Sequence, residues 1–459
     1  MIGRLAVKSL AAHPVRSAVL AAGFGLGVAV MAILLGVAEV VLEQSRAPAL
    51  AGGGDVVVRL GPDVPAQLLL AGPLQSDALA PRVRVAAPFH TSSVYLLRDG
   101  ARVRVRARGG IPSLERRLGD RETASVPGWR DSPADVAWTQ DSPERLLRHI
   151  DRFRPIPDAP EWADSWAEWL YFNGRTANTR FYLTFLVGPR VESGRRAAGV
   201  RLQLERDGRT ETFGRSTELT DAEVQDAPDL TIGTAAVRLR GMHYHIDLDL
   251  PGEHGRRVRG SIRLEASPGR LVPPLEVRGA RGWLTGYVVP VTSGVLGGWL
   301  DIDGTRVPLD GGTGYHDHNW GFWERVSWRW GQVQHDGLSV IYGRVLPPAD
   351  AADPAHMPGF VGALGPEGPI GYATDVTITE TDDAQGNPAS ISVRARGRAL
   401  DLALRFDVTS RVTTRTTQGP IARGLDFLQL QGTYTVTGQV AGRRIDFQAP
   451  GAAETFRGE

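Results

Sequence analysis

The sequence predicts a mostly β protein, with tandem antiparallel barrels or sandwiches behind one N-terminal transmembrane helix. Two observations support this prediction. Hydrophobicity alternates with a period of two from about residue 168 onward, and an uncharged apolar stretch lies near the N-terminus. The chain has 459 residues, which suggests about three folding units.

The composition excludes several kinds of chemistry. The 52 basic and 51 acidic residues nearly cancel, so the chain has no overall positive field that would attract nucleic acid. The sequence contains no cysteine, which excludes thiol catalysis, disulfides and cysteine-containing zinc sites. Lys8 is the only lysine, so Schiff-base chemistry is excluded from the folded part. We therefore expect no nucleic-acid partner and no cofactor.

Residues 17–38 carry no charge and are long enough to cross a bilayer as a helix of about 33 Å. Basic residues precede this segment, and Glu39 and Glu43 follow it. The N-terminus is therefore predicted inside and the bulk of the chain outside the cytoplasmic membrane. A cleaved signal peptide is the alternative, but no A-x-A site closes the run. A scaffolding role would rest on Gly23 and Gly27, a G-x-x-x-G pair.

The first 45 residues resemble the first membrane helix, with its cytoplasmic lead-in, of FtsX/MacB-type transporter permeases. Those permeases have three further spans, and this sequence has none. The resemblance therefore implies a partner of an ABC transporter permease or ATPase complex. Residues 46–150 are predicted to form a small β-containing connector, with a short helix that begins at Ser142.

From about residue 168 the alternation is typical of half-buried strands. Val200, Leu202 and Leu204 alternate with polar residues, and the same pattern recurs over residues 400–408. Turns rich in Gly, Asp or Asn separate the strands. We expect two β domains, over residues 151–324 and 325–459, because about 290 residues are too many for an ordinary single barrel.

The most unusual residues are concentrated in GYHDHNWG at 314–321, and four of the eleven tryptophans lie between residues 320 and 330. A second cluster, EWLYFNG, lies at 168–174. Large aromatic side chains combined with a few polar groups favour an apolar pocket. We expect four of these aromatic residues to contact an apolar ligand: Tyr171, Trp323, Trp328 and Trp330.

At these residues the sequence resembles the AttH-type lipocalin-like family that includes carotenoid 1,2-hydratase (hydroxyneurosporene synthase). The matching segments are EWLYFNG at 168–174, GYVVPVTSGVLGGWLDIDG at 286–304, GYHDHNWG at 314–321 and GAAETF at 451–456. The resemblance implies tandem calycin barrels and a long lipid or isoprenoid ligand. In the hydratases it also implies acid-catalysed addition of water to a terminal isoprene double bond, with catalytic importance for His318 and Trp320.

Protonation of an unactivated alkene needs an acid that stays neutral near pH 7. Asp317 is our candidate, because burial of a carboxyl among Trp rings raises its pKa. The aromatic faces of Trp320 and Trp323 would stabilise the resulting cation. His316 or His318 would deprotonate the incoming water.

The sequence departs from the hydratases on the strand after the motif. The family has a Tyr-x-Asp there, whereas this sequence has Tyr342 followed two residues later by Arg344. The main prediction is therefore a membrane-anchored protein that binds an apolar ligand, and a hydratase is the alternative. A structure separates the two by whether Asp317, His318 and Tyr342 line one enclosed apolar space.

Other interpretations remain open at this stage. The HDHN segment could be a hydrogen-bonded corner without catalysis, and the tryptophans could fill the core. Two H-x-H pairs, at 243/245 and 316/318, could bind a metal if their strands were neighbours, but the first pair has the alternation of a solvated strand, and we predict no metal. Glu168 and Glu454 are expected to close the barrels through backbone or arginine hydrogen bonds.

Overall fold

The computed structural model describes most of the chain from residue 56 onward. The described residues are 14–15, 56–60, 64–71, 74, 80–98, 101–119, 127–140, 142–397, 399–416 and 425–457. The predicted membrane-spanning segment, residues 17–38, lies outside them, as do Gly23 and Gly27. No helix in the described ranges has the length and apolar character that a membrane span requires.

The chain divides into two compact units, and the smaller one comprises residues 1–59 and 84–138. Its hairpin consists of β1 (Phe89–Arg98) and β2 (Ala101–Gly110), which pair antiparallel along their whole length. Helices α4 (Pro112–Leu118) and α6 (Pro133–Thr139) follow the hairpin. An ion pair of 2.7 Å between Arg108 and Glu115 ties β2 to α4.

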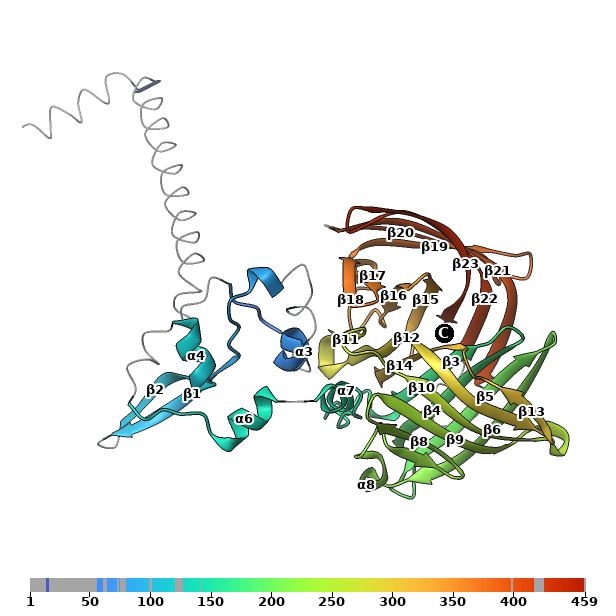
Figure 1. The fold of residues 1–459 in the computed structure, drawn as a ribbon, viewed down its shortest axis with the longest axis horizontal. Coiled ribbons are helices and arrows are strands. Elements are labelled where there is room, and N and C mark those ends of the chain that lie inside the picture. The colour runs from blue at the N-terminus through green and yellow to red at the C-terminus, as the bar shows by residue number, and fades with distance from the viewer. Residues whose placement is uncertain are drawn as a thin grey trace, which may run out of the picture. The chain divides into compact units, whose positions relative to one another are not determined.

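The larger unit, residues 60–83 and 139–459, contains two antiparallel barrels (Figure 1). Two helices precede its strands: α3 (Ala66–Ala71) and α7 (Pro143–Ile150). The predicted start of α7 is confirmed, because the Ser142 side chain accepts a hydrogen bond of 3.2 Å from the Arg145 amide. This N-cap satisfies an amide that would otherwise lack a partner.

The first barrel has the strand order β6-β5-β4-β3-β14-β12-β10-β9-β8-β7, with β11 and β13 paired to β12. Its strands are β3 (Trp166–Arg175), β4 (Thr179–Arg190), β5 (Arg196–Arg206), β6 (Arg209–Leu219), β7 (Leu230–Ile232), β8 (Ala235–Arg240), β9 (His243–Pro251), β10 (Arg257–Glu265), β11 (Val272–Arg278), β12 (Leu284–Ile302), β13 (Thr305–Pro308) and β14 (Thr313–Phe322). A bridge between Phe213 and Gly252 brings the β6 edge toward the end of β9, so the barrel is nearly closed.

The second barrel has the strand order β18-β17-β16-β15-β23-β22-β21-β20-β19. Its strands are β15 (Ser327–His335), β16 (Leu338–Leu346), β17 (Phe360–Gly365), β18 (Gly368–Ala373), β19 (Asp375–Asp382), β20 (Pro388–Gly397), β21 (Leu400–Thr416), β22 (Leu425–Val440) and β23 (Arg443–Arg457). The prediction of a mostly β chain with tandem antiparallel barrels is therefore confirmed.

The predicted alternation and turns explain how these strands form. Val200, Leu202 and Leu204 are buried in the core of the first barrel, as their period-two spacing predicts. The turn at Asp207 and Gly208 has φ values of 52° and 73°. Two consecutive positive φ values suit a two-residue hairpin, and Asp-Gly adopts them at low cost.

Each barrel has its own core, and a third cluster of buried residues lies between the barrels. Its members come from strands of both barrels: Tyr171, Tyr182, Val272, Val289, Tyr315, Trp330, Ile341, Leu364 and Ala452. The outer faces of β3, β4 and β14 therefore pack against the outer faces of β15, β16 and β23. This packing positions the candidate site.

Candidate functional site

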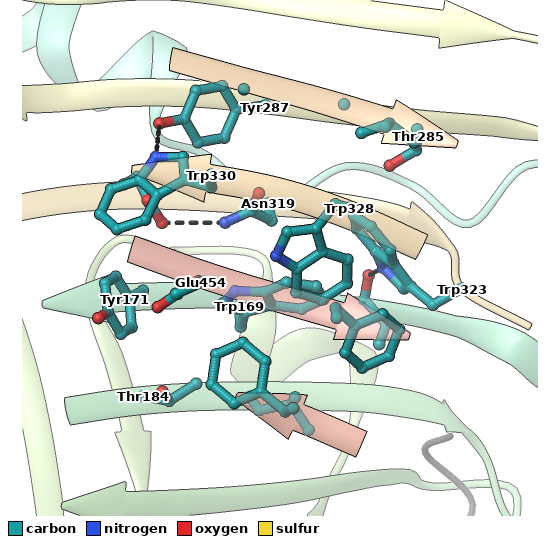
Figure 2. A pocket seen from close by; sticks show the side chains of 18 of the residues that line it. Trp169, Tyr171, Thr184, Thr285, Tyr287, Asn319, Trp323, Trp328, Trp330 and Glu454 are labelled. Carbon is teal, nitrogen blue, oxygen red and sulfur yellow. Dashed lines mark hydrogen bonds between the residues drawn. The ribbon is translucent and has the colours of Figure 1, made fainter. Parts of the chain in front are cut away.

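A cavity of about 770 Å³ lies between the two barrels, at the edge of this third cluster. Aromatic side chains from both barrels dominate its lining: Trp169, Tyr171, Tyr182, Tyr287, Trp323, Trp328, Trp330, Phe360, Tyr372, Phe427 and Phe456 (Figure 2). Tyr372 is 47% exposed, so the cavity reaches the surface. Its volume is within the range of about 300–1,000 Å³ that is typical of small-molecule sites.

Several of these rings form a continuous aromatic band across the cavity. The ring of Trp328 stacks on Phe456 with centroids 3.9 Å apart, and Trp169 lies 6.0 Å from Trp328 and 4.7 Å from Trp323. The structure thus brings all four aromatic residues that are predicted to contact a ligand into the lining: Tyr171, Trp323, Trp328 and Trp330. Their contact with a ligand stays a prediction.

Strand β14 contributes to two different environments, because successive side chains of a strand point to opposite faces. Asp317 and Asn319 line the cavity. The residues between and beside them, His316, His318 and Trp320, are fully buried on the other face, at the core of the first barrel. The GYHDHNWG motif is therefore divided between the cavity and the barrel core.

Asp317 is the acid of β14 that lines the cavity. Its carboxylate accepts hydrogen bonds from the Tyr315 hydroxyl at 2.9 Å and from the Asn319 amide at 2.9 Å. A chain of donors leads to it, since Trp330 Nε1 donates to the Tyr287 hydroxyl at 2.8 Å and Tyr287 bonds to Tyr315 at 2.7 Å. Burial, and secondly the charge of nearby Glu454, raise the pKa of Asp317 well above its ordinary value.

Glu454 is a second acid that lines the cavity (Figure 2). Burial raises its pKa to about 7, and the nearby polar groups of Tyr171, Gln429 and Trp328 limit the rise. Its Oε1 and the Tyr171 hydroxyl are buried and make no well-formed hydrogen bond with a described residue. The sequence predicts a structural role for Glu454, held by backbone or arginine hydrogen bonds; in the structure it faces the cavity instead.

His316 and His318 are tied to carboxylates on the far side of β14. Asp151 Oδ2 lies 3.0 Å from His316 Nε2, and Asp151 Oδ1 lies 3.0 Å from His318 Nδ1. The other ring nitrogens face the Tyr171 carbonyl and Glu168 Oε1, each at 3.0 Å. Both nitrogens of each ring therefore face oxygen atoms, which fixes the orientation of the two rings.

This network holds the segment that follows α7 against the barrel. Glu168 also accepts two hydrogen bonds from the Arg154 amide, at 2.8 and 3.1 Å, in keeping with its predicted structural role. Burial alone would raise the pKa of Asp151, but the charges and hydrogen bonds of His316 and His318 outweigh it and lower that pKa. The sequence offers no signal for Asp151, because it lies about 165 residues from its histidine partners.

The remaining predicted residues lie outside the cavity or at its edge. The Trp320 ring packs in the first barrel with the Arg154 guanidinium 3.6 Å from its centroid. Tyr342 is buried in the second barrel, where its hydroxyl lies 3.2 Å from that of Tyr434. Asp317, His318 and Tyr342 do not line one space. Strand alternation on β14 separates Asp317 from His318, and Tyr342 belongs to β16 and the core of the second barrel.

Two further groups bear on the predicted chemistry. Arg344 lines the cavity and donates to the backbone carbonyl of Pro354 at 3.3 Å. The two H-x-H pairs do not converge, since Tyr244 between His243 and His245 points inward to contact His316, with ring centroids 4.6 Å apart. In the described part of the chain, no three His, Asp or Glu side chains are grouped as metal ligands.

Comparison with known proteins finds similarity only among solved structures. No known family matches the sequence, and no curated protein does. The chain is similar to kievitone hydratase from Nectria haematococca, with 13% identity over 67% of this chain and 94% of that chain, and a TM-score of 0.44. It is also similar to a putative AttH protein from Nitrosomonas europaea, with 14% identity over 67% of this chain and 98% of that chain, and a TM-score of 0.40. A third similar structure is CghA, with 12% identity over 69% of this chain and 95% of that chain, and a TM-score of 0.38.

Removal of the Asp151 carboxylate should destabilise the protein strongly. Asp151→Ala leaves two buried imidazole rings without their shared partner, so we expect the free energy of unfolding to fall by about 3–5 kcal/mol. Urea denaturation followed by circular dichroism measures this. Asp247→Ala, on the exposed face of β9, is the control and should change stability by less than about 0.5 kcal/mol. Equal effects of the two substitutions would contradict the network.

Glu454 should make stability depend on pH. Its pKa is about 7 in the folded state and 4.5 ordinarily, so the folded state binds more protons between these values. The free energy of unfolding should therefore fall as pH rises from 4.5 to 7, by up to about 3 kcal/mol from this group. Glu454→Gln should remove this contribution and be the more stable form at pH 8. If the free energy of unfolding of Glu454→Gln depended on pH as it does in the parent, the pKa of Glu454 would not be raised by folding.

Proposed function

We propose that this protein binds a long apolar ligand, of the lipid or isoprenoid class, in the cavity between its two barrels. The observation that supports this most is the cavity itself, about 770 Å³ and lined by aromatic side chains from both barrels. Each buried methylene contributes about 0.8 kcal/mol, so ten would contribute about 8 kcal/mol before the cost of association. Trp169, Trp328 and Phe456, whose rings stack in series, give the cavity an aromatic wall that suits an unsaturated chain.

A substitution that fills the cavity should weaken binding of an apolar ligand. Thr184 on β4 lines the cavity (Figure 2), so the larger side chain of Thr184→Phe should reduce the affinity for farnesol by about tenfold. Titration followed by tryptophan fluorescence measures this. Thr210→Phe, at an exposed position on β6, is the matched control and should leave affinity unchanged. Tight farnesol binding by Thr184→Phe would show that the ligand lies elsewhere.

A second candidate function is acid-catalysed addition of water to a carbon–carbon double bond. Two carboxyls with raised pKa values face the same apolar cavity, and this observation favours it. In our scheme the neutral Asp317 carboxyl protonates one alkene carbon, and a cation forms on the other. Water adds to the cation, and Glu454 takes the proton that the water loses. The rings of Tyr171 and Trp330 replace Trp320 as the faces toward the cation.

Substitution of Asp317 tests this second function. An acyclic carotenoid incubated with the protein in D₂O should yield a hydroxylated product with one deuterium on the protonated carbon. Asp317→Asn should reduce the rate by at least about a hundredfold, because an amide cannot supply the proton. The control Asp247→Asn should keep the rate of the parent. Absence of any hydration by the parent would contradict the hydratase and leave the binding function in place.

Membrane anchorage is a separate proposal that rests on the sequence alone. Residues 17–38 would hold the cavity close to the bilayer, on the outer side, which would shorten the passage of an apolar ligand through water. An ABC transporter complex as partner remains a prediction from the resemblance of residues 1–45. Full-length protein that alkaline carbonate releases from membranes would contradict the anchor.

A further inference from the structure

The cavity has a polar end that the proposed function does not explain. The lining includes Arg201 on β5, in the same row of paired residues as Asp317. That row runs from Asp317 on β14 through Tyr171 and Thr184 to Arg201. Three strand spacings separate its ends, which corresponds to about 14 Å between backbones. Asp317 therefore lies at one end of this row and the Arg201 guanidinium at the other. Glu218 on β6 also lines the cavity, and its carboxylate accepts a hydrogen bond from Ser193 rather than from Arg201.

Arg201 differs from the other arginines that line the cavity. Arg329 lies 3.1 Å from Glu380, Arg344 bonds to backbone carbonyls, and Arg215 lies near enough to Asp249 to lower its pKa. Arg201 has no hydrogen bond or ion pair with any residue that the structure describes. Burial alone lowers its pKa, with no carboxylate to offset the loss of water. Its charge is half-buried and uncompensated.

A second polar group beside Arg201 also lacks a partner. Gln203 lies on the same face of β5, lines the cavity and is 2% exposed. Its Oε1 is buried and makes no hydrogen bond in the described part of the chain. A buried polar atom without a partner is costly, and it is rare in folded proteins unless water or a ligand satisfies it. Because an amide oxygen only accepts hydrogen bonds, water or a hydroxyl of a ligand would satisfy it, whereas the Arg201 guanidinium is the group in this part of the lining that can donate to an anion.

We propose that Arg201 binds an anionic oxygen group, a carboxylate or a phosphate ester, at one end of an amphipathic ligand whose apolar chain lies between the barrels. This inference rests on the proposed binding function. It also orients the ligand. An anionic head at the other end would face Asp317 and Glu454, two acids, whereas at Arg201 it meets the uncompensated cation. The apolar end of the ligand then lies beside the two acids.

Three probes with the same chain length test the proposal on the full-length protein: palmitate, its methyl ester and hexadecyl phosphate. Titrations followed by tryptophan fluorescence give the affinity of each. We expect at least one of the anions to bind about tenfold or more tightly than the ester, and its affinity to fall with added salt. The ratio between palmitate and hexadecyl phosphate distinguishes a carboxylate from a phosphate ligand.

Variants assign the preference to the residue. Arg201→Gln should lose the tenfold preference for the anion and keep the affinity for the ester, whereas Arg201→Lys should retain most of the preference. Arg209→Gln, at an exposed position on β6, is the control and should behave as the parent. Equal binding of ester and anions to the parent, or an unchanged preference in Arg201→Gln, would overturn the inference and leave the proposed function standing. If none of the three probes binds, the proposed function fails as well.

Discussion

The alternation of side chains along β14 is the constraint on which the rest of the site depends. One strand faces the core of the first barrel on one side and the space between the barrels on the other. His316 and His318 consequently serve the barrel, whereas Asp317 serves the cavity. Residues that are adjacent in sequence therefore lie in different environments. Because they share one strand, the hydrogen bonds that hold His316 and His318 also fix the face to which Asp317 points.

The two faces treat buried charge in opposite ways. In the barrel core, Asp151 and Glu168 form hydrogen bonds with two imidazole rings, and this network holds the chain in place. On the cavity side, Asp317 and Glu454 form no ion pair with a residue that the structure describes, and burial raises their pKa values. Unmatched carboxyls lower stability above neutral pH. A cost of this kind is common at functional sites, where perturbed pKa values cluster.

The sequence predicts the barrels, the hairpin turns, the start of α7 and the aromatic composition of the site, because each depends on local patterns. It does not predict where the cavity lies, since that depends on how two barrels pack. Asp151 could not be found, because its partners are distant in sequence and a lone Asp after a helix has no distinctive pattern. The alternation of side chains along a strand could have predicted from the sequence that His318 and Asp317 lie on opposite faces. The position of Glu454 in the cavity could not be predicted, because it depends on how β23 packs against β3.

The central claim is that an apolar ligand lies between the barrels rather than inside one of them. A crystal structure of the protein soaked with a brominated fatty-acid ester tests this most directly, because the anomalous signal of bromine locates the chain. We expect the bromine peak among Trp169, Trp328 and Phe456, on the outer face of both barrels. A bromine peak within the interior of either barrel would contradict the account. So would the absence of a peak in the crystal when titration in solution shows that the protein is saturated with the same ester.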